Sequence, residues 1–196
     1  MHSFSAAGRL VHGARHRAYW CRPPTLASVL AAHARFWPEI IALWRLHQAA
    51  PLRPADLLAR GVSALRCRPR DAAEVLALCA DSPGLDRAGV AERLYRHPQD
   101  IPAVAAAVLA DAPLVRLWAF LAPQDDAGKP TGESVTAGYL AVARYAGLSP
   151  VELMDAPAEA VLDTFDALRH EAEDEETPTA EVEAPGVTLI GKPGVN

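Results

Sequence analysis

An apolar stripe between residues 26 and 47 constrains the fold of this chain more than any other feature. Its members recur at alternating intervals of four and three residues: Leu26, Leu30, His33, Trp37, Ile40, Trp44 and His47. This spacing is that of one packed face of an α-helix. Thr25 precedes the stripe with a hydroxyl that can cap the first helical turn. We therefore predict a long helix from residue 26 whose stripe packs against other elements.

Pro38 interrupts this predicted helix. A proline inside a helix removes a hydrogen bond and kinks the backbone, whereas a proline in the first turn is well tolerated. The segment is therefore either one kinked helix or two consecutive helices. The stripe is either core or an exposed oligomer seam. We predict that Trp37, Ile40 and Trp44 line an apolar groove for a partner.

The rest of the chain also predicts helices, because it is rich in Ala, Leu, Arg and Glu. The segments that we interpret as helices are 53–67, 70–80, 86–97, 103–112, 113–122, 134–146 and 157–170. Residues 1–20 are expected to add a short basic helix. Prolines and glycines separate these segments. The sequence therefore predicts an all-α fold, an irregular bundle of about seven or eight short helices.

Charge is distributed unevenly along the chain. Residues 1–70 carry 11 Arg, no Lys and only two acids, Glu39 and Asp56, which gives a net charge of +9. Residues 71–196 carry a net charge of −14, so the whole chain has −5. We divide the chain into a basic N-terminal arm (1–24), an all-α helical domain (25–170) and an acidic, disordered tail (171–196).

The tail ends in a short apolar tip. Its residues are Val187, Thr188, Leu189 and Ile190. A β-prone peptide of this kind can add to the sheet edge of another protein or enter a groove on it. We therefore predict a docking motif here, with a frayed chain end as the alternative.

Seven arginines form what we name the basic set. They are Arg9, Arg15, Arg17, Arg22, Arg66, Arg68 and Arg70. Tyr19 and Trp20 lie among them, and arginine with aromatic neighbours can bind phosphates and stack on bases. The alternative function is therefore a nucleic-acid-binding accessory protein that the acidic tail autoinhibits. A solvated face that pairs with the chain's own acids explains the same residues.

The remaining motifs favour no catalytic or metal chemistry. Residues 143–157 have the spacing of a helix-turn-helix, but the following helix has a net charge near −4, which DNA phosphates would repel. His12 and His16 are four residues apart with His2 and Cys21 nearby, but the defined ligand spacing of a zinc site is missing. We predict no catalytic residue, no cofactor and no metal.

Because charge-free stretches fall short of about 20 residues, we also predict a cytoplasmic protein without a membrane partner.

One family resemblance follows from the segment "TAGYLAVARYAGLSPVELMDAPAEAVLDTFDAL". It resembles parts of the small helical tail-assembly chaperones of tailed phages, in which a "GLSP-x-EL" corner leads into a last helix and an acidic end. "PLRPADLLARG" is similar in style to phage accessory proteins. The resemblance implies a protein that shields an aggregation-prone tail component during assembly. We therefore predict a non-enzymatic adaptor or assembly chaperone that binds another protein or a macromolecular assembly.

Overall fold

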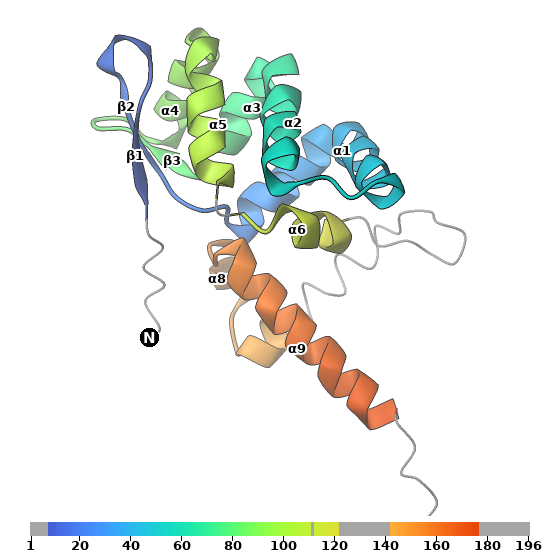
Figure 1. The fold of residues 1–196 in the computed structure, drawn as a ribbon. Helices are drawn as coiled ribbons and strands as arrows, with labels where there is room; N and C mark the ends of the chain where they lie inside the picture. The colour runs from blue at the N-terminus through green and yellow to red at the C-terminus, as the bar shows by residue number, and fades with distance from the viewer. Residues whose placement is uncertain (1–7, 111, 122–141, 177–196) are drawn as a thin grey trace, which may run out of the picture.

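The computed structural model describes residues 8–110, 112–121 and 142–176 of the chain (Figure 1). These residues form a mostly helical fold, which confirms the main part of the predicted fold class. The stricter prediction of an all-α fold is wrong, because three short strands form an antiparallel sheet in the order β1-β2-β3. The apolar tip at 187–190 and the part of the predicted helix 134–146 up to residue 141 lie outside the described residues.

The fold consists of a small three-stranded sheet and a set of helices. The strands are β1 (Arg9–His12), β2 (Ala18–Cys21) and β3 (Ala80–Asp81), and the short 3-10 helices are η1 (Ala14–His16) and η2 (Pro98–Asp100). The helices are α1 (Leu26–Ala49), α2 (Pro54–Cys67), α3 (Pro69–Leu76), α4 (Arg87–Arg96), α5 (Ile101–Leu109), α6 (Leu114–Leu121), α8 (Pro150–Met154) and α9 (Ala158–Glu176). The core lies where α1 to α5 meet, with Leu57, Leu94, Ile101 and Val104 fully buried. In Figure 1, α9 extends away from this core.

The N-terminal segment is a β-hairpin and not the short basic helix that the sequence predicts. β1 and β2 pair antiparallel, with Leu10 opposite Trp20 and Val11 opposite Tyr19. Tyr19 and Cys21 are buried, whereas Trp20 between them is 46% exposed, which is the two-residue alternation of a strand. Each strand has only four residues. Such a short alternation cannot be distinguished from a helical segment by periodicity alone.

The buried carboxylate of Asp100 holds this hairpin against the helices. It accepts hydrogen bonds from the backbone N–H of Ala14 (2.8 Å) and from the hydroxyl of Tyr19 (2.9 Å). The guanidinium of Arg17 donates through Nε at 2.6 Å and through Nη2 at 3.2 Å. Gly13 comes so close that a β-carbon there would lie 2.5 Å from Cγ of Asp100. One acid thus organises a loop that lies 86 residues earlier in the chain.

This network lowers the pKa of the Asp100 carboxyl below its ordinary value of 3.8. Burial alone would raise the pKa, but hydrogen bonds from Arg17, Ala14 and Tyr19 stabilise the charged form more strongly. The network therefore contributes its full stability above the unfolded-state pKa and loses it as the pH falls through the folded-state value. We expect an NMR titration of the Asp100 carboxyl carbon to give a pKa below 3.8. A value at or above 3.8 would contradict the network.

α1 consists of two helical segments that meet at a kink at Phe36, where the backbone departs from helical angles (φ −116°, ψ 21°). Pro38, two residues later, therefore lies in the first turn of the second segment, which is the second of the two alternatives that the sequence leaves open. Thr25 caps the start of α1 as predicted, with its hydroxyl accepting a hydrogen bond from the Ser28 N–H at 3.4 Å. The buried apolar residues of α1 are Leu26, Val29, Phe36 and Ile40. Leu30 and Trp44 of the predicted stripe are partly buried and also pack against the core, so the stripe belongs to the packed side of α1.

Residues 143–157 form a corner between helices. The negative charge of the following helix favours this interpretation over a DNA-binding motif. Gly147 has a left-handed backbone (φ 63°), and the N–H of Leu148 donates to the carbonyl of Ala143 at 3.0 Å, which ends the preceding helix. Ser149 and Glu152 then form a reciprocal capping box at the start of α8. α8 ends at Met154, so this helix is too short for the recognition helix of a helix-turn-helix.

α9 continues past residue 170, where the sequence places the end of the helical domain. Its acidic side chains are partly neutralised by α6. Nη2 of Arg116 lies 2.8 Å from Oδ1 of Asp163 and 2.7 Å from Oδ2 of Asp166. This bridge connects α6 to the first half of α9.

Candidate functional site

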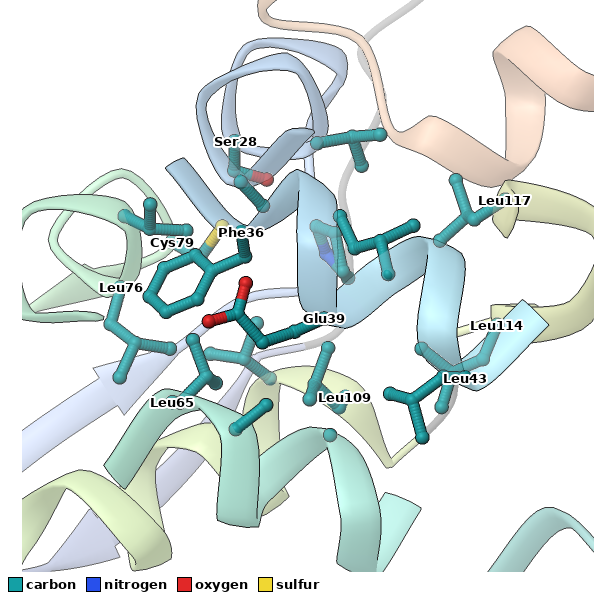
Figure 2. A pocket seen from close by; sticks show the side chains of 18 residues that line it. Ser28, Phe36, Glu39, Leu43, Leu65, Leu76, Cys79, Leu109, Leu114 and Leu117 are labelled. Carbon is teal, nitrogen blue, oxygen red and sulfur yellow. The ribbon is translucent and has the colours of Figure 1, made fainter. Parts of the chain in front are cut away.

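An apolar cavity between α1, α2, α3, α5 and α6 is the candidate site (Figure 2). Its volume is about 120 Å³. The large side chains of its walls include Phe36, Ile40, Leu65, Leu76, Leu109 and Leu117. A cavity of about 150 Å³ with walls of this kind stays dry and binds benzene. Size and lining therefore suit one apolar group the size of a ring.

Small residues on the walls leave this space unfilled. Ala32 of α1 and both Gly61 and Ala64 of α2 line the cavity with little or no side chain. A β-carbon at Gly61 would lie 3.6 Å from Cδ1 of Leu109, which is an ordinary van der Waals contact. The backbones of α1 and α2 therefore leave a space that these small side chains do not fill.

The carboxylate of Glu39 is the charged group of the cavity. Its Oε1 lies 3.2 Å from Nη2 of Arg68. Its Oε2 is buried and has no hydrogen-bond partner among residues 8–110, 112–121 and 142–176. Figure 2 shows the carboxylate beside the Phe36 ring, among the apolar walls. A buried polar atom without a partner costs about 1–3 kcal/mol, so a ligand that donates a hydrogen bond here would be stabilised.

Arg68 connects the junction of α2 and α3 to α1. Its Nη1 donates to the carbonyl of Arg35 at 2.6 Å, and its guanidinium carbon lies 5.9 Å from the centroid of the Phe36 ring. The Arg68 side chain is 42% exposed. The Glu39–Arg68 pair is therefore partly in solvent at both ends, with the Glu39 side chain 27% exposed, while its Oε2 atom is buried.

Only one of the three predicted groove residues lines the cavity. Ile40 is buried and lines the cavity. Trp37 lies beside His33, with their ring centroids 4.3 Å apart, and is not part of the cavity wall. Trp44 is partly buried against the core, and its Nε1 has no acceptor in the part of the chain that the structure describes. The structure therefore brings one of the three into the cavity and adds Phe36 and Leu43, which the stripe omits.

The basic set is divided between two places and is largely paired with acids. Arg9, Arg15 and Arg17 belong to the hairpin, and Arg22 directly follows β2. The other three members lie around the junction of α2 and α3. Four members form ion pairs: Arg17 with Asp100, Arg22 with Asp81, Arg68 with Glu39 and Arg70 with Glu74. Arg15 and Arg66 form no ion pair within the described ranges. Less of this charge is therefore available for phosphates than the sequence indicates.

Two further questions from the sequence concern a metal site and a membrane span. His12 lies in β1 and His16 in η1, so the two do not share a helix face. In the described part of the chain, no three His, Cys, Asp or Glu side chains are grouped so that they could hold a metal ion. α1 is long and apolar enough to cross a membrane by length and composition, a criterion that core helices of soluble proteins also meet.

Comparisons with known proteins give no family for this chain. No protein-family model, no curated protein and no solved structure matches it. The cavity and the residues around it are therefore the basis for assigning a function.

Proposed function

We propose that the protein is a non-enzymatic adaptor or assembly chaperone whose apolar cavity accepts one apolar side chain of a partner protein. The cavity is the observation that supports this proposal: it has ring-sized volume and walls from five helices. Desolvated pockets that accept a single anchor side chain concentrate the binding energy of protein interfaces. Residues 136–168 resemble parts of the tail-assembly chaperones of tailed phages. We therefore extend the proposal to the assembly of a phage tail in the cytoplasm.

A second hollow favours a polypeptide as the occupant. It has a volume of about 420 Å³ and shares Leu109 and Leu114 with the cavity. Residues of α2 and α6, such as Leu58 and Val115, complete its walls. A peptide with one side chain in the cavity can place its neighbouring residues in this hollow. A free molecule the size of one ring would leave it empty.

Selection from a random peptide library tests this proposal. We expect the wild-type protein to enrich peptides that share one apolar anchor residue. Ala64→Phe places a phenyl ring where the anchor would bind, so it should weaken the selected peptides by about thirtyfold, the effect of one hot-spot contact of about 2 kcal/mol. Dissociation constants from calorimetry provide the measurement.

The matched control is Ala59→Phe, because Ala59 lies on the exposed side of the same helix. This variant should bind the selected peptides like wild type. The proposal is wrong if no shared anchor emerges, or if both phenylalanine variants bind the peptides equally well.

A further inference from the structure

We propose that the cavity selects a phenolic ring, the side chain of a tyrosine in the partner, whose hydroxyl donates a hydrogen bond to Oε2 of Glu39. This inference rests on the proposed function and specifies its anchor residue. Three properties of the cavity carry it: a missing hydrogen bond, a charge that is already balanced, and a ring-sized apolar volume.

The missing interaction at Glu39 is a hydrogen bond. Its Oε1 already has Nη2 of Arg68 at 3.2 Å, while Oε2 is buried and has no donor among the residues that the structure describes. A hydroxyl that donates to a carboxylate oxygen forms a short, charge-assisted hydrogen bond of about 2.5–2.7 Å. A ligand with one hydroxyl at the edge of the cavity would therefore complete the bonding of this carboxylate.

The charge around Glu39 favours a neutral donor. Arg68 balances the charge of Glu39, and the neighbouring Arg35 is balanced by Glu74, with Nη2 and Oε2 separated by 2.8 Å. A cationic occupant such as lysine would add an uncompensated positive charge beside two arginines. An anionic occupant would lie next to a carboxylate that already lacks a donor. A neutral hydroxyl avoids both costs.

The volume and the walls favour a single ring. About 120 Å³ suits a group of about the size of benzene. A phenylalanine or leucine side chain would satisfy the apolar walls but would leave Oε2 of Glu39 without a donor. A site that is built to bond a hydroxyl discriminates strongly against the analogue without it, because its own polar atom then stays unpaired.

Two small probes of equal shape test this inference. The probes are p-cresol, which is the tyrosine side chain, and p-xylene, which has a methyl group in place of the hydroxyl. We expect wild-type protein to bind p-cresol about tenfold more tightly than p-xylene, as for a hydrogen bond to a charged group. Dissociation constants come from the NMR shifts of leucine and valine methyl groups.

The variant Glu39→Met removes the acceptor and keeps the length of the side chain. Its p-cresol affinity should fall about tenfold or more, while its p-xylene affinity stays equal or rises. Arg68 is 42% exposed, so it remains hydrated without its partner and thermal unfolding should show a folded protein. Ala64→Phe should bind neither probe, and Ala59→Phe should bind both.

The outcomes separate this inference from the proposed function. If wild type binds p-xylene as tightly as p-cresol, or if Glu39→Met keeps the preference for p-cresol, the tyrosine anchor is wrong but the apolar cavity remains a binding site. If the peptide selection also yields no shared anchor, the proposed function fails as well. If p-cresol binds through Glu39 but no peptide is selected, the site takes a free phenol and the partner protein is wrong.

Discussion

Substitution of Asp100 by asparagine is expected to lower the free energy of unfolding by about 3 to 5 kcal/mol. The side chain of Asp100 is fully buried, and that of Arg17 is only 14% exposed. Asparagine keeps the size but removes the charge, and its NH₂ group faces donors from Ala14, Arg17 or Tyr19 in place of an acceptor. Arg17 is then left nearly buried without a counter-charge. Urea denaturation at pH 7, followed by circular dichroism, measures the loss.

The same substitution at Asp86 is the control. Asp86 caps α4, where its Oδ1 accepts a hydrogen bond from the N–H of Gly89 at 2.8 Å. Asparagine caps helices about as well as aspartate, so Asp86→Asn should change the free energy of unfolding by less than about 0.5 kcal/mol. If Asp100→Asn is as mild as this control, the hairpin does not depend on the buried carboxylate.

The helices were predictable where local signals coincide. Thr25 before an apolar stripe, Pro54 at a helix start and the Gly147–Ser149 corner each define a boundary through nearby residues alone. The hairpin was not predictable in this way. Its loop is fixed by Asp100, and no periodicity connects residues that are 86 positions apart. The acidic composition after residue 170 likewise did not indicate that α9 continues to Glu176.

The candidate site was predictable only in part, for a geometric reason. The cavity residues of α1 include Val29, Ala32, Phe36, Ile40 and Leu43, which form a face beside the predicted stripe and share only Ile40 with it. Trp37 belongs to the stripe but not to this face. Glu39 is marked by its place in the sequence. It is one of two acids among the first 70 residues and follows an apolar run with two aromatic residues, Phe36 and Trp37.

Alanine in place of Gly13 is expected to lower the free energy of unfolding by about 1 to 3 kcal/mol. The backbone of Gly13 (φ −75°, ψ −176°) is extended and open to any residue, so the loss would come from contact alone. The new β-carbon would lie 2.5 Å from Cγ and 2.6 and 2.7 Å from the two oxygens of Asp100. That side chain is short and held by several donors, so it cannot turn away without losing its hydrogen bonds.

Gly61→Ala is the matched control and should have the opposite sign. Gly61 lies inside α2, where alanine is favoured over glycine by about 0.5–1 kcal/mol, and its β-carbon would meet only Cδ1 of Leu109 at 3.6 Å. Thermal and urea unfolding of both variants provide the comparison. Opposite signs would attribute the loss at Gly13 to the contact with Asp100, because both changes add the same methyl group. If Gly13→Ala is neutral, the hairpin loop can move away from the carboxylate, and Asp100 then does not fix its position.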